Sequence, residues 1–353
     1  MVKSHIVKKS IDDFWKRIPK KIKLSVKSLP TALNGFMGKL RTFKGGLTLI
    51  CLIILSIVPI FTKNPFYLGI FMMACIYSIY ASSWDFMTGY TGLVSFGHAI
   101  FLGLAGYGTS VGLVFLGFNW LIALLFGSII SVVIGVLIAI PSLRLKGPYL
   151  ALTLLSISMI LWSLFLMGEL SPWLRGSQGI SQVPLLSPNP VIEYITTFII
   201  MVLSLGIMKM LGSAKFGKIL NSIRDDDTGA EASGINISKY KILAFMISAF
   251  FAGIAGGLFA MHNRGVDPGR FQPLYSFYPI IMVAVGGLAT ISGGALGAFI
   301  FVFLNEILIE LAPWAPLFVF SIILILIIRF SERGIMRPAI ERLKELWDVL
   351  LGK

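Results

Sequence analysis

Charged residues are scarce in this sequence. They make up only 13% of the 353 residues, whereas 56% are hydrophobic and the mean hydropathy is +0.88. A water-soluble protein of this composition would leave much of its apolar surface uncovered. The composition therefore excludes a soluble globular protein and predicts an integral membrane protein.

Residue types that carry chemistry are also rare. The two cysteines, Cys51 and Cys75, lie inside apolar runs without the spacing of a zinc or redox motif, so we interpret both as packing residues. The three histidines, His5, His98 and His262, are too scattered to complete a metal cluster or a nucleophile–base pair. We therefore predict no catalytic residue, no metal site and no cofactor bound by this chain, and an intramembrane enzyme is disfavoured.

No row of titratable groups crosses the apolar part of the sequence. The ionisable residues in or near apolar runs are Asp85, His98, Glu193, Lys209, Glu306 and Glu310. Glu193, Lys209 and Glu310 fall near the ends of the runs, where snorkelling to the headgroups explains them. His98 and Glu306 sit deeper, so each is a candidate for lining a pathway, although His98 is equally suited to capping a broken helix. A carrier driven by protons or sodium is not indicated, and we expect the energy to come from elsewhere.

The apolar runs predict an all-α polytopic membrane protein. Runs of roughly 20 residues are long enough to cross the hydrocarbon layer. We expect about ten transmembrane helices, or eight to ten because two runs are short, at residues 46–62, 66–83, 92–115, 119–140, 148–168, 191–211, 241–261, 274–289, 293–311 and 315–330.

The basic residues predict the orientation of these spans. The net charge is +14, and residues 1–44 hold twelve of the thirty Lys and Arg residues. With a cytoplasmic N-terminus, 26 basic residues fall inside and four outside, which agrees with the positive-inside rule and places both termini in the cytoplasm. Anionic membrane lipid explains the basic segment better than nucleic acid does, and the segment is too long for a signal peptide.

Three regions follow from this pattern. Residues 1–44 are predicted to be a basic cytoplasmic segment, residues 45–331 a transmembrane domain with a long cytoplasmic loop at 212–240, and residues 332–353 a cytoplasmic amphipathic tail.

Glycines indicate close helix packing and two broken helices. Pairs of small residues four positions apart within the spans favour close approach of neighbouring helix backbones. These pairs are Gly108 with Gly112, Gly253 with Gly257, and Gly293 with Gly297.

Two longer clusters, residues 89–99 and 286–297, interrupt apolar runs with glycine and hydroxyl residues. Freed backbone groups cannot face lipid, so such breaks must lie against protein or line a wet cavity. Corresponding breaks in the two halves of a transporter indicate its substrate path. The two clusters here have similar sequences, which suggests an inverted repeat.

The loop at 212–240 predicts a compact pair of surface helices. Residues 216–224 form an amphipathic stretch, the acids at 225–227 suit a helix N-terminus, and Gly234 suits a helix C-terminus. This pattern fits a knob on which another protein docks, and a solvated loop held at the headgroups is the alternative.

Several motifs together resemble a known family. They are the segment 91–101 (Thr-Gly-Leu-Val-Ser-Phe-Gly-His-Ala-Ile-Phe), the segments 147–155 and 176–180, the loop just described, and the segments 241–258 and 285–298. In this order and spacing they resemble the permease subunits of high-affinity branched-chain amino-acid ABC importers, over about residues 66–335.

The resemblance implies a set of partners in a prokaryotic plasma (inner) membrane. These are a second homologous permease, two cytoplasmic subunits that bind ATP with magnesium, and an external solute-binding protein. This chain has no Gly-x-x-x-x-Gly-Lys-Ser/Thr phosphate loop, which agrees with ATP being bound by partners.

The resemblance also implies which residues contact these partners. The residues expected to couple to the ATPase are Phe216, Gly217, Arg224, Asp225, Ala230, Glu231 and Gly234. Those expected to face the binding protein are Gly176, Gln178 and Gly179.

We expect six residues to line the substrate pathway: Ser95, Gly97, His98, Thr153, Thr290 and Ser292. The transported molecule stays open, because related permeases serve urea and short amides and no residue separates the two substrate classes. A stand-alone carrier or channel that does not depend on ATP is the alternative from another functional class.

Overall fold

A computed structural model describes residues 43–143, 145, 147–167, 174–312 and 314–330. Most of the predicted segment 1–44, the predicted tail 332–353 and the side chain of Cys51 lie outside these residues. Helix α3 (Phe43–Phe61) crosses the boundary after Ile57 between two compact units, and all later elements belong to the second unit. The packing described below is that of the second unit.

The described part of the second unit is almost entirely helical. Its α-helices are α4 (Pro65–Thr91), α5 (Ala99–Val114), α6 (Trp120–Ser142), α7 (Pro148–Leu166), α9 (Pro190–Ser213), α10 (Lys215–Asp225), α11 (Asp227–Ala232), α12 (Ile237–His262), α13 (Pro273–Gly286), α14 (Ile291–Leu311) and α15 (Ala315–Phe330). Two short 3₁₀ turns, η2 (Gly176–Gln178) and η3 (Pro268–Phe271), accompany a two-residue antiparallel ribbon of β1 (Ile180–Ser181) and β2 (Gly265–Val266).

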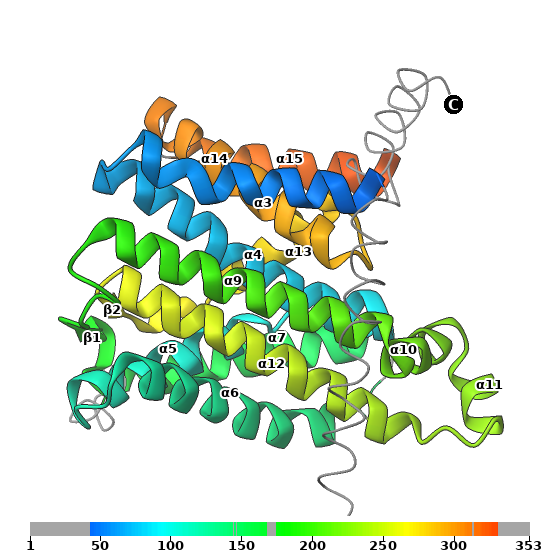
Figure 1. Cartoon of the computed structure of the whole chain (residues 1–353). Coiled ribbons are helices and arrows are strands. Elements are labelled where there is room, and N and C mark those ends of the chain that lie inside the picture. Colours follow the sequence, from blue (N-terminus) through cyan, green and yellow to red (C-terminus); the bar gives the residue numbers. More distant parts are fainter. Residues whose placement is uncertain (1–42, 144, 146, 168–173, 313, 331–353) are drawn as a thin grey trace, which may run out of the picture. The chain divides into compact units, whose positions relative to one another are not determined.

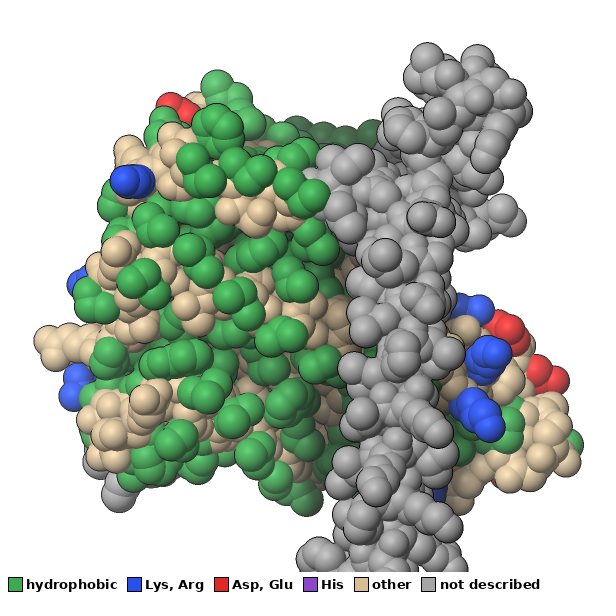
Figure 2. Space-filling view, viewed as in Figure 1, with side chains coloured by type: hydrophobic (Ala, Val, Ile, Leu, Met, Phe, Trp, Pro, Cys, Tyr) green, Lys and Arg blue, Asp and Glu red, His purple; other side chains and the backbone are tan. Residues whose placement is uncertain are grey.

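The predicted fold class is confirmed. With α10 and α11 set aside, the described helices correspond one to one to the ten predicted spans. Six of them, α4, α6, α7, α9, α12 and α14, are long and apolar enough to cross a membrane. Hydrophobic side chains cover much of the helical surface seen in Figure 2, whereas charged side chains lie at its two ends, at the left edge and over α10 and α11 at the right.

Asparagine caps determine where four of the long helices begin. Asn64, Asn119 and Asn189 each accept a hydrogen bond from the backbone N–H two residues later, at 3.0–3.2 Å, and Asn236 accepts one from Lys239. Proline follows directly at Pro65 and Pro190, where a missing N–H has no cost.

Helices α4 and α12 form the centre of the second unit. In the most apolar stretches of α4 and α12, 67% and 72% of the residues are buried, compared with 28–33% in α6, α7, α9 and α14. Helix α12 packs against α4, α5 and α6, while α4 also packs against α9 and α14 (Figure 1). The outer helices present isoleucine and leucine side chains outward, as lipid-facing helices do.

The predicted close packing at glycine is confirmed. A Cβ added at Gly108 would lie 2.8 Å from the Gly127 backbone of α6, and one at Gly253 would lie 2.9 Å from the Ser128 backbone. One added at Gly297 would overlap the Met282 carbonyl of α13. These three contacts allow the backbones of neighbouring helices to touch.

Both predicted helix breaks exist, but each is shorter than the predicted segment, 89–99 for the first and 286–297 for the second. Helix α4 continues through Gly89 and ends at Thr91, so the break covers only residues 92–98, and α4 is longer than the predicted span 66–83. Gly92 adopts φ 74° and closes the helix with a bond to the Thr88 carbonyl at 2.9 Å. The second break covers residues 287–290.

The breaks explain two short helices. Helix α13 has 14 residues and α5 has 16, so at about 1.5 Å per residue neither spans roughly 30 Å of hydrocarbon alone. Residues 287–290 follow α13 directly and residues 92–98 precede α5. Non-helical segments therefore extend these two crossings.

We predict that the α12–α6 contact limits stability. Gly253→Leu forces a side chain into the Ser128 backbone, and overpacking of this kind costs about 1–3 kcal/mol, so the thermal midpoint should fall by about 3 °C or more. Gly206→Leu on α9 is the matched control, because nothing lies within 4 Å of a Cβ there. Melting curves of the purified protein in detergent test this, and equal midpoints for the two variants would contradict it.

Candidate functional site

Helices α10 and α11 lie at one end of the bundle, and the β1–β2 ribbon lies at the other (Figure 1). We call these the α10–α11 end and the ribbon end. The predicted pair of surface helices at 212–240 is confirmed. Asp226 caps α11 by accepting from Thr228 N–H at 3.0 Å, and Gly234 ends it with φ 82° and a bond from its N–H to the Glu231 carbonyl at 2.9 Å.

The residues predicted to couple to a partner divide into anchors and exposed positions. Phe216 stacks on Phe86 of α4 with ring centroids 6.4 Å apart, and a Cβ at Gly217 would overlap the Gly212 carbonyl. Ala230 is also buried. The remaining predicted coupling residues are exposed, and they are Arg224, Asp225, Glu231 and Gly234. An ion pair of 2.7 Å between Lys241 Nζ and Asp227 Oδ2 ties α11 to α12.

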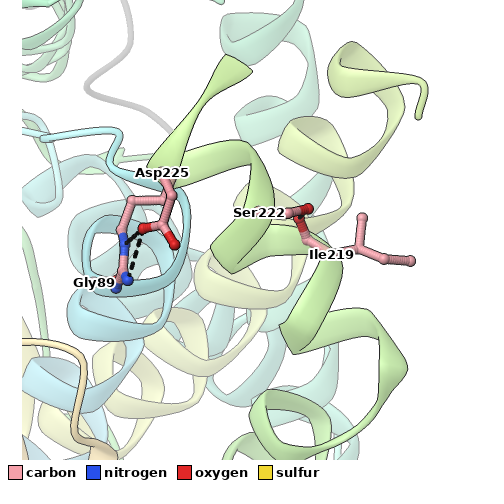
Figure 3. Close-up of polar contacts among 5 residues, drawn as sticks. Gly89, Ile219, Ser222 and Asp225 are labelled. Carbon is pink, nitrogen blue, oxygen red and sulfur yellow. Dashed lines mark hydrogen bonds and ion pairs between the residues drawn. The ribbon is translucent and has the colours of Figure 1, made fainter. Parts of the chain in front are cut away.

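Arg224 connects α10 to the end of α4. Its Nη1 donates to the Gly89 carbonyl at 2.8 Å. Its Nε and Nη2 donate to Asp225 Oδ1 at 3.1 and 3.0 Å, and dashed lines mark these contacts at Asp225 in Figure 3. A Cβ at Gly92 would lie 3.1 Å from Arg224 Cγ, so the side chain lies directly against the turn that ends α4. A cation suits this place, because the last carbonyls of a helix carry partial negative charge.

The last turns of α4 also hold the second break. The carboxylate of Asp85, which has no exposed surface, accepts the Ala289 N–H at 2.7 Å through Oδ1. Ala289 has φ 57°, and its Cα would lie 2.8 Å from a Cβ at Gly89. Arg224, α4 and the 287–290 break therefore form one continuous set of contacts.

Sequence reasoning missed this role of Asp85. It counted Asp85 among the intramembrane ionisable residues without assigning it a partner. The sequence did contain a signal for it: Asp85 lies one helical turn before Gly89, on the same helix face. A glycine there leaves room for the backbone of another segment to approach the carboxylate.

The first break is buried at Ser95, Gly97 and His98, whereas Gly92 and Val94 are exposed. Trp84 Nε1 donates to the Ser95 carbonyl at 2.8 Å, and Thr88 Oγ1 donates to the Leu93 carbonyl at 3.0 Å. A Cβ at Gly97 would overlap the Leu154 carbonyl of α7. Side chains thus satisfy carbonyls that the helix no longer uses, as a lipid environment requires.

His98 is fully buried in this structure. Its Nε2 lies 2.9 Å from Ser83 Oγ, and its ring lies 5.0 Å from that of Tyr80. The capping alternative is wrong, because the imidazole makes no capping bond to α5.

The six residues predicted to line a pathway fall into two groups. Ser95, Gly97 and His98 are buried at the first break, and Thr153 is half-buried on α7 beside Leu154, which contacts Gly97. Thr290, in the second break, and Ser292, in the first turn of α14, are exposed. Their role in a pathway stays a prediction.

A cavity of about 490 Å³ lies at the ribbon end, between α4, α12, η3, α13 and α14. Its polar lining consists of Tyr77, His262, Asn263, Arg270, Tyr275, Tyr278, Asn305 and Glu306. None of the six predicted pathway residues lines it. Of its lining, sequence reasoning singled out only Glu306 as a candidate for a pathway, because aromatic residues spread over four helices give no sequence pattern.

Glu193 does not snorkel as predicted. It is 5% exposed, and its Oε1 lies 3.6 Å from His262 Nδ1. The first turn of α9 packs against α4, and Tyr194 beside Glu193 is fully buried, so the carboxylate is directed inward.

The loop predicted to face an external protein is pinned at the ribbon end. Ile180 pairs with Val266, and the Val183 N–H donates to the Arg264 carbonyl at 3.1 Å. Gly176 and Gly179 are buried with positive φ, whereas Gln178 is exposed. Within the described residues, no group of three His, Cys, Asp or Glu side chains is placed to hold a metal ion.

Known proteins match most of the chain. The high-affinity branched-chain amino acid transport system permease protein LivM of Salmonella typhimurium is 25% identical, over 86% of this chain and 77% of that protein. The probable branched-chain amino acid transport permease protein LivM of Methanocaldococcus jannaschii is 26% identical, over 61% of this chain and 68% of that protein.

A relative with a different printed substrate matches as well. The autoinducer 2 import system permease protein LsrC of Yersinia pseudotuberculosis is 25% identical, over 64% of this chain and 65% of that protein. No solved structure matches the chain. The family of permease components of branched-chain amino acid transport systems matches residues 66–328, which include α4 through α14 and most of α15, and the chain belongs to this family.

Proposed function

We propose that this multi-pass membrane protein forms half of the substrate pathway in an ATP-driven importer of branched-chain or related amino acids. The observation that carries the proposal is the contact of Arg224 with α4. This contact joins the exposed helices α10 and α11 to α4. Helix α4 in turn holds the second break through the hydrogen bond of Asp85. A partner that moves α10 and α11 therefore acts directly on the transmembrane helices.

Charge supports a cytoplasmic position for the α10–α11 end. Six basic residues lie between Lys209 and Lys241, whereas Lys63, Arg175, Arg264 and Arg270 are the basic residues in the segments leading to and from the ribbon end. The positive-inside rule then assigns the α10–α11 end to the cytoplasm of a prokaryotic cell and the ribbon end to the outside.

Each end suits one kind of partner. One of the importer's two cytoplasmic subunits that bind ATP and magnesium docks on α10 and α11. Such subunits are needed because this chain lacks a phosphate loop of its own. An external solute-binding protein docks at the ribbon end near Gln178. A second, related permease completes the pathway, and the two differently named relatives in Methanocaldococcus jannaschii, LivM and LivH, support such a pair.

The mechanism we propose is alternating access. Closure of the ATP-binding partners displaces α10, and Arg224 transmits the displacement to Gly89 at the end of α4. Asp85 then carries it to Ala289, where four non-helical residues allow α13 to shift against α14. Bistable packing of this kind converts a small displacement into a switch between two arrangements.

The first prediction concerns composition. A complex captured from native membranes in mild detergent through a C-terminal tag on this chain should contain a second permease and two ATP-binding chains, identified by mass spectrometry. Recovery of this chain alone or as a homo-oligomer would favour the stand-alone carrier or channel.

The second prediction concerns Arg224. Arg224→Ala removes a charge-assisted hydrogen bond of about 1.5–3 kcal/mol, so ATP-driven uptake into proteoliposomes should fall about tenfold while ATP hydrolysis continues. Lys218→Ala is the control, because it removes an exposed positive charge from α10 without touching α4. Normal coupled uptake by the Arg224 variant would argue against α10 as the coupling element.

The third prediction concerns Asp85. Asp85→Asn keeps an oxygen that accepts the Ala289 N–H, whereas Asp85→Ala removes it and leaves a buried donor without a partner, at about 1–3 kcal/mol. Uptake should therefore fall much further in the alanine variant than in the asparagine variant. Equal losses in the two variants would show that the carboxylate charge matters rather than the hydrogen bond.

A further inference from the structure

Aromatic rings form much of the wall of the cavity at the ribbon end. Tyr278 lies 5.0 Å from Phe301 and 5.4 Å from Tyr275, measured between ring centroids. Tyr77 lies 6.1 Å from Tyr278 and 6.2 Å from Phe259. These five rings come from α4, α12, α13 and α14, and all line the cavity.

The wall already holds one cation against its rings. The guanidinium of Arg270 lies 4.7 Å from the Phe259 centroid and 4.9 Å from the Tyr275 centroid. Its charge is balanced, because Nη2 and Nε bind Asp267 Oδ2 at 2.8 and 3.0 Å. Arg270 is therefore fixed in place and carries no unmet charge into the cavity.

Glu306 differs from Arg270. Its half-buried side chain lines the cavity beside Asn305 and makes no ion pair or hydrogen bond within the described part of the chain. Two other carboxylates lie near the cavity, and both have partners: Asp267 pairs with Arg270, and Glu193 faces His262 at 3.6 Å. Glu306 is thus the carboxylate of the cavity wall without a partner among the described residues.

An unpaired carboxylate beside several aromatic faces selects a cation. The faces of Tyr and Phe rings attract ammonium groups, and an ionisable residue of a membrane helix that faces a cavity marks a candidate substrate or ion site. The cavity volume falls in the range of small-molecule sites, roughly 300–1,000 Å³, and Ile70, Met73 and Val302 supply an apolar wall.

We infer that Glu306 binds the ammonium group of the transported molecule in this cavity. The inference rests on the proposed function and narrows it to ligands with a primary ammonium and a compact apolar side chain. Urea and short amides carry no such charge and lose the contact with Glu306. Glu306 is then a specificity-determining residue on the side at which the substrate enters.

The test measures binding to the full chain in nanodiscs by saturation-transfer NMR, which detects weak ligands. The probes are L-leucine, 3-methylbutylamine and isovalerate, of which the last two share the branched alkyl group and carry only the amine or only the carboxylate. Leucine and the amine should give signals that fall about fivefold or more in Glu306→Gln, because a charge-assisted contact is lost. Glu310→Gln, exposed one turn further along α14 and outside the cavity lining, should match the unaltered protein.

A competition in the unaltered protein tests the same point without a variant. The amine should displace leucine, and isovalerate and acetamide should not. Equal amine signals in Glu306→Gln and the unaltered protein, or displacement of leucine by isovalerate or acetamide, would overturn the inference.

Lipid is the other source of an ammonium group. Nanodiscs of phosphatidylglycerol contain none, so leucine should bind there, and adding phosphatidylethanolamine should leave its signal unchanged. Loss of the leucine signal on that addition would assign the site to a lipid headgroup and overturn the substrate role. These measurements need no ATP-binding partner, so a failed capture of the complex and a failed binding test are distinguishable.

Discussion

The need to satisfy every backbone polar group away from water governs this structure. Two helices stop within the bundle, after Thr91 and after Gly286, and each stop releases donors and acceptors that lipid cannot satisfy. At the first stop, side chains of α4 supply the partners, with Trp84 bonding the Ser95 carbonyl. At the second, the Asp85 carboxylate accepts the Ala289 N–H. Helix α4 therefore holds both breaks, which explains why it is long, central and rich in buried polar residues.

Because side chains of α4 hold both breaks, a residue that contacts the end of α4 is connected to both of them. Arg224 of α10 binds the Gly89 carbonyl and lies against Gly92, where the helix turns into the first break. Gly89 also lies against Ala289 of the second break. Glycine is needed at this crossing because a side chain would separate the three segments. The exposed helices α10 and α11 thus reach the non-helical parts of the bundle through a single helix end.

The polar groups at the two ends of the bundle have different surroundings. At the α10–α11 end, the buried carboxylate of Asp85 is engaged through Oδ1 with the protein backbone. At the ribbon end, the cavity leaves Glu306 without a partner in the described part of the chain, among rings that suit a cation. The first arrangement fits transmission of movement and the second fits recognition. The substrate contact is accordingly inferred at the ribbon end.

The sequence alone determined the architecture. Apolar runs located the ten described helices other than α10 and α11, Gly234 and the acids at 225–227 marked the ends of α11, and paired glycines indicated backbone contact, because each of these effects acts over a few neighbouring residues. The extent of α4 was misjudged because tertiary packing stabilises a helix through Gly89 that local propensity disfavours. The partner of Asp85, the inward direction of Glu193 and the aromatic cavity depend on residues that are far apart in the sequence, 204 positions for Asp85 and Ala289. Only the tertiary structure decided those, because the packing of helices that are remote in sequence brings their side chains together.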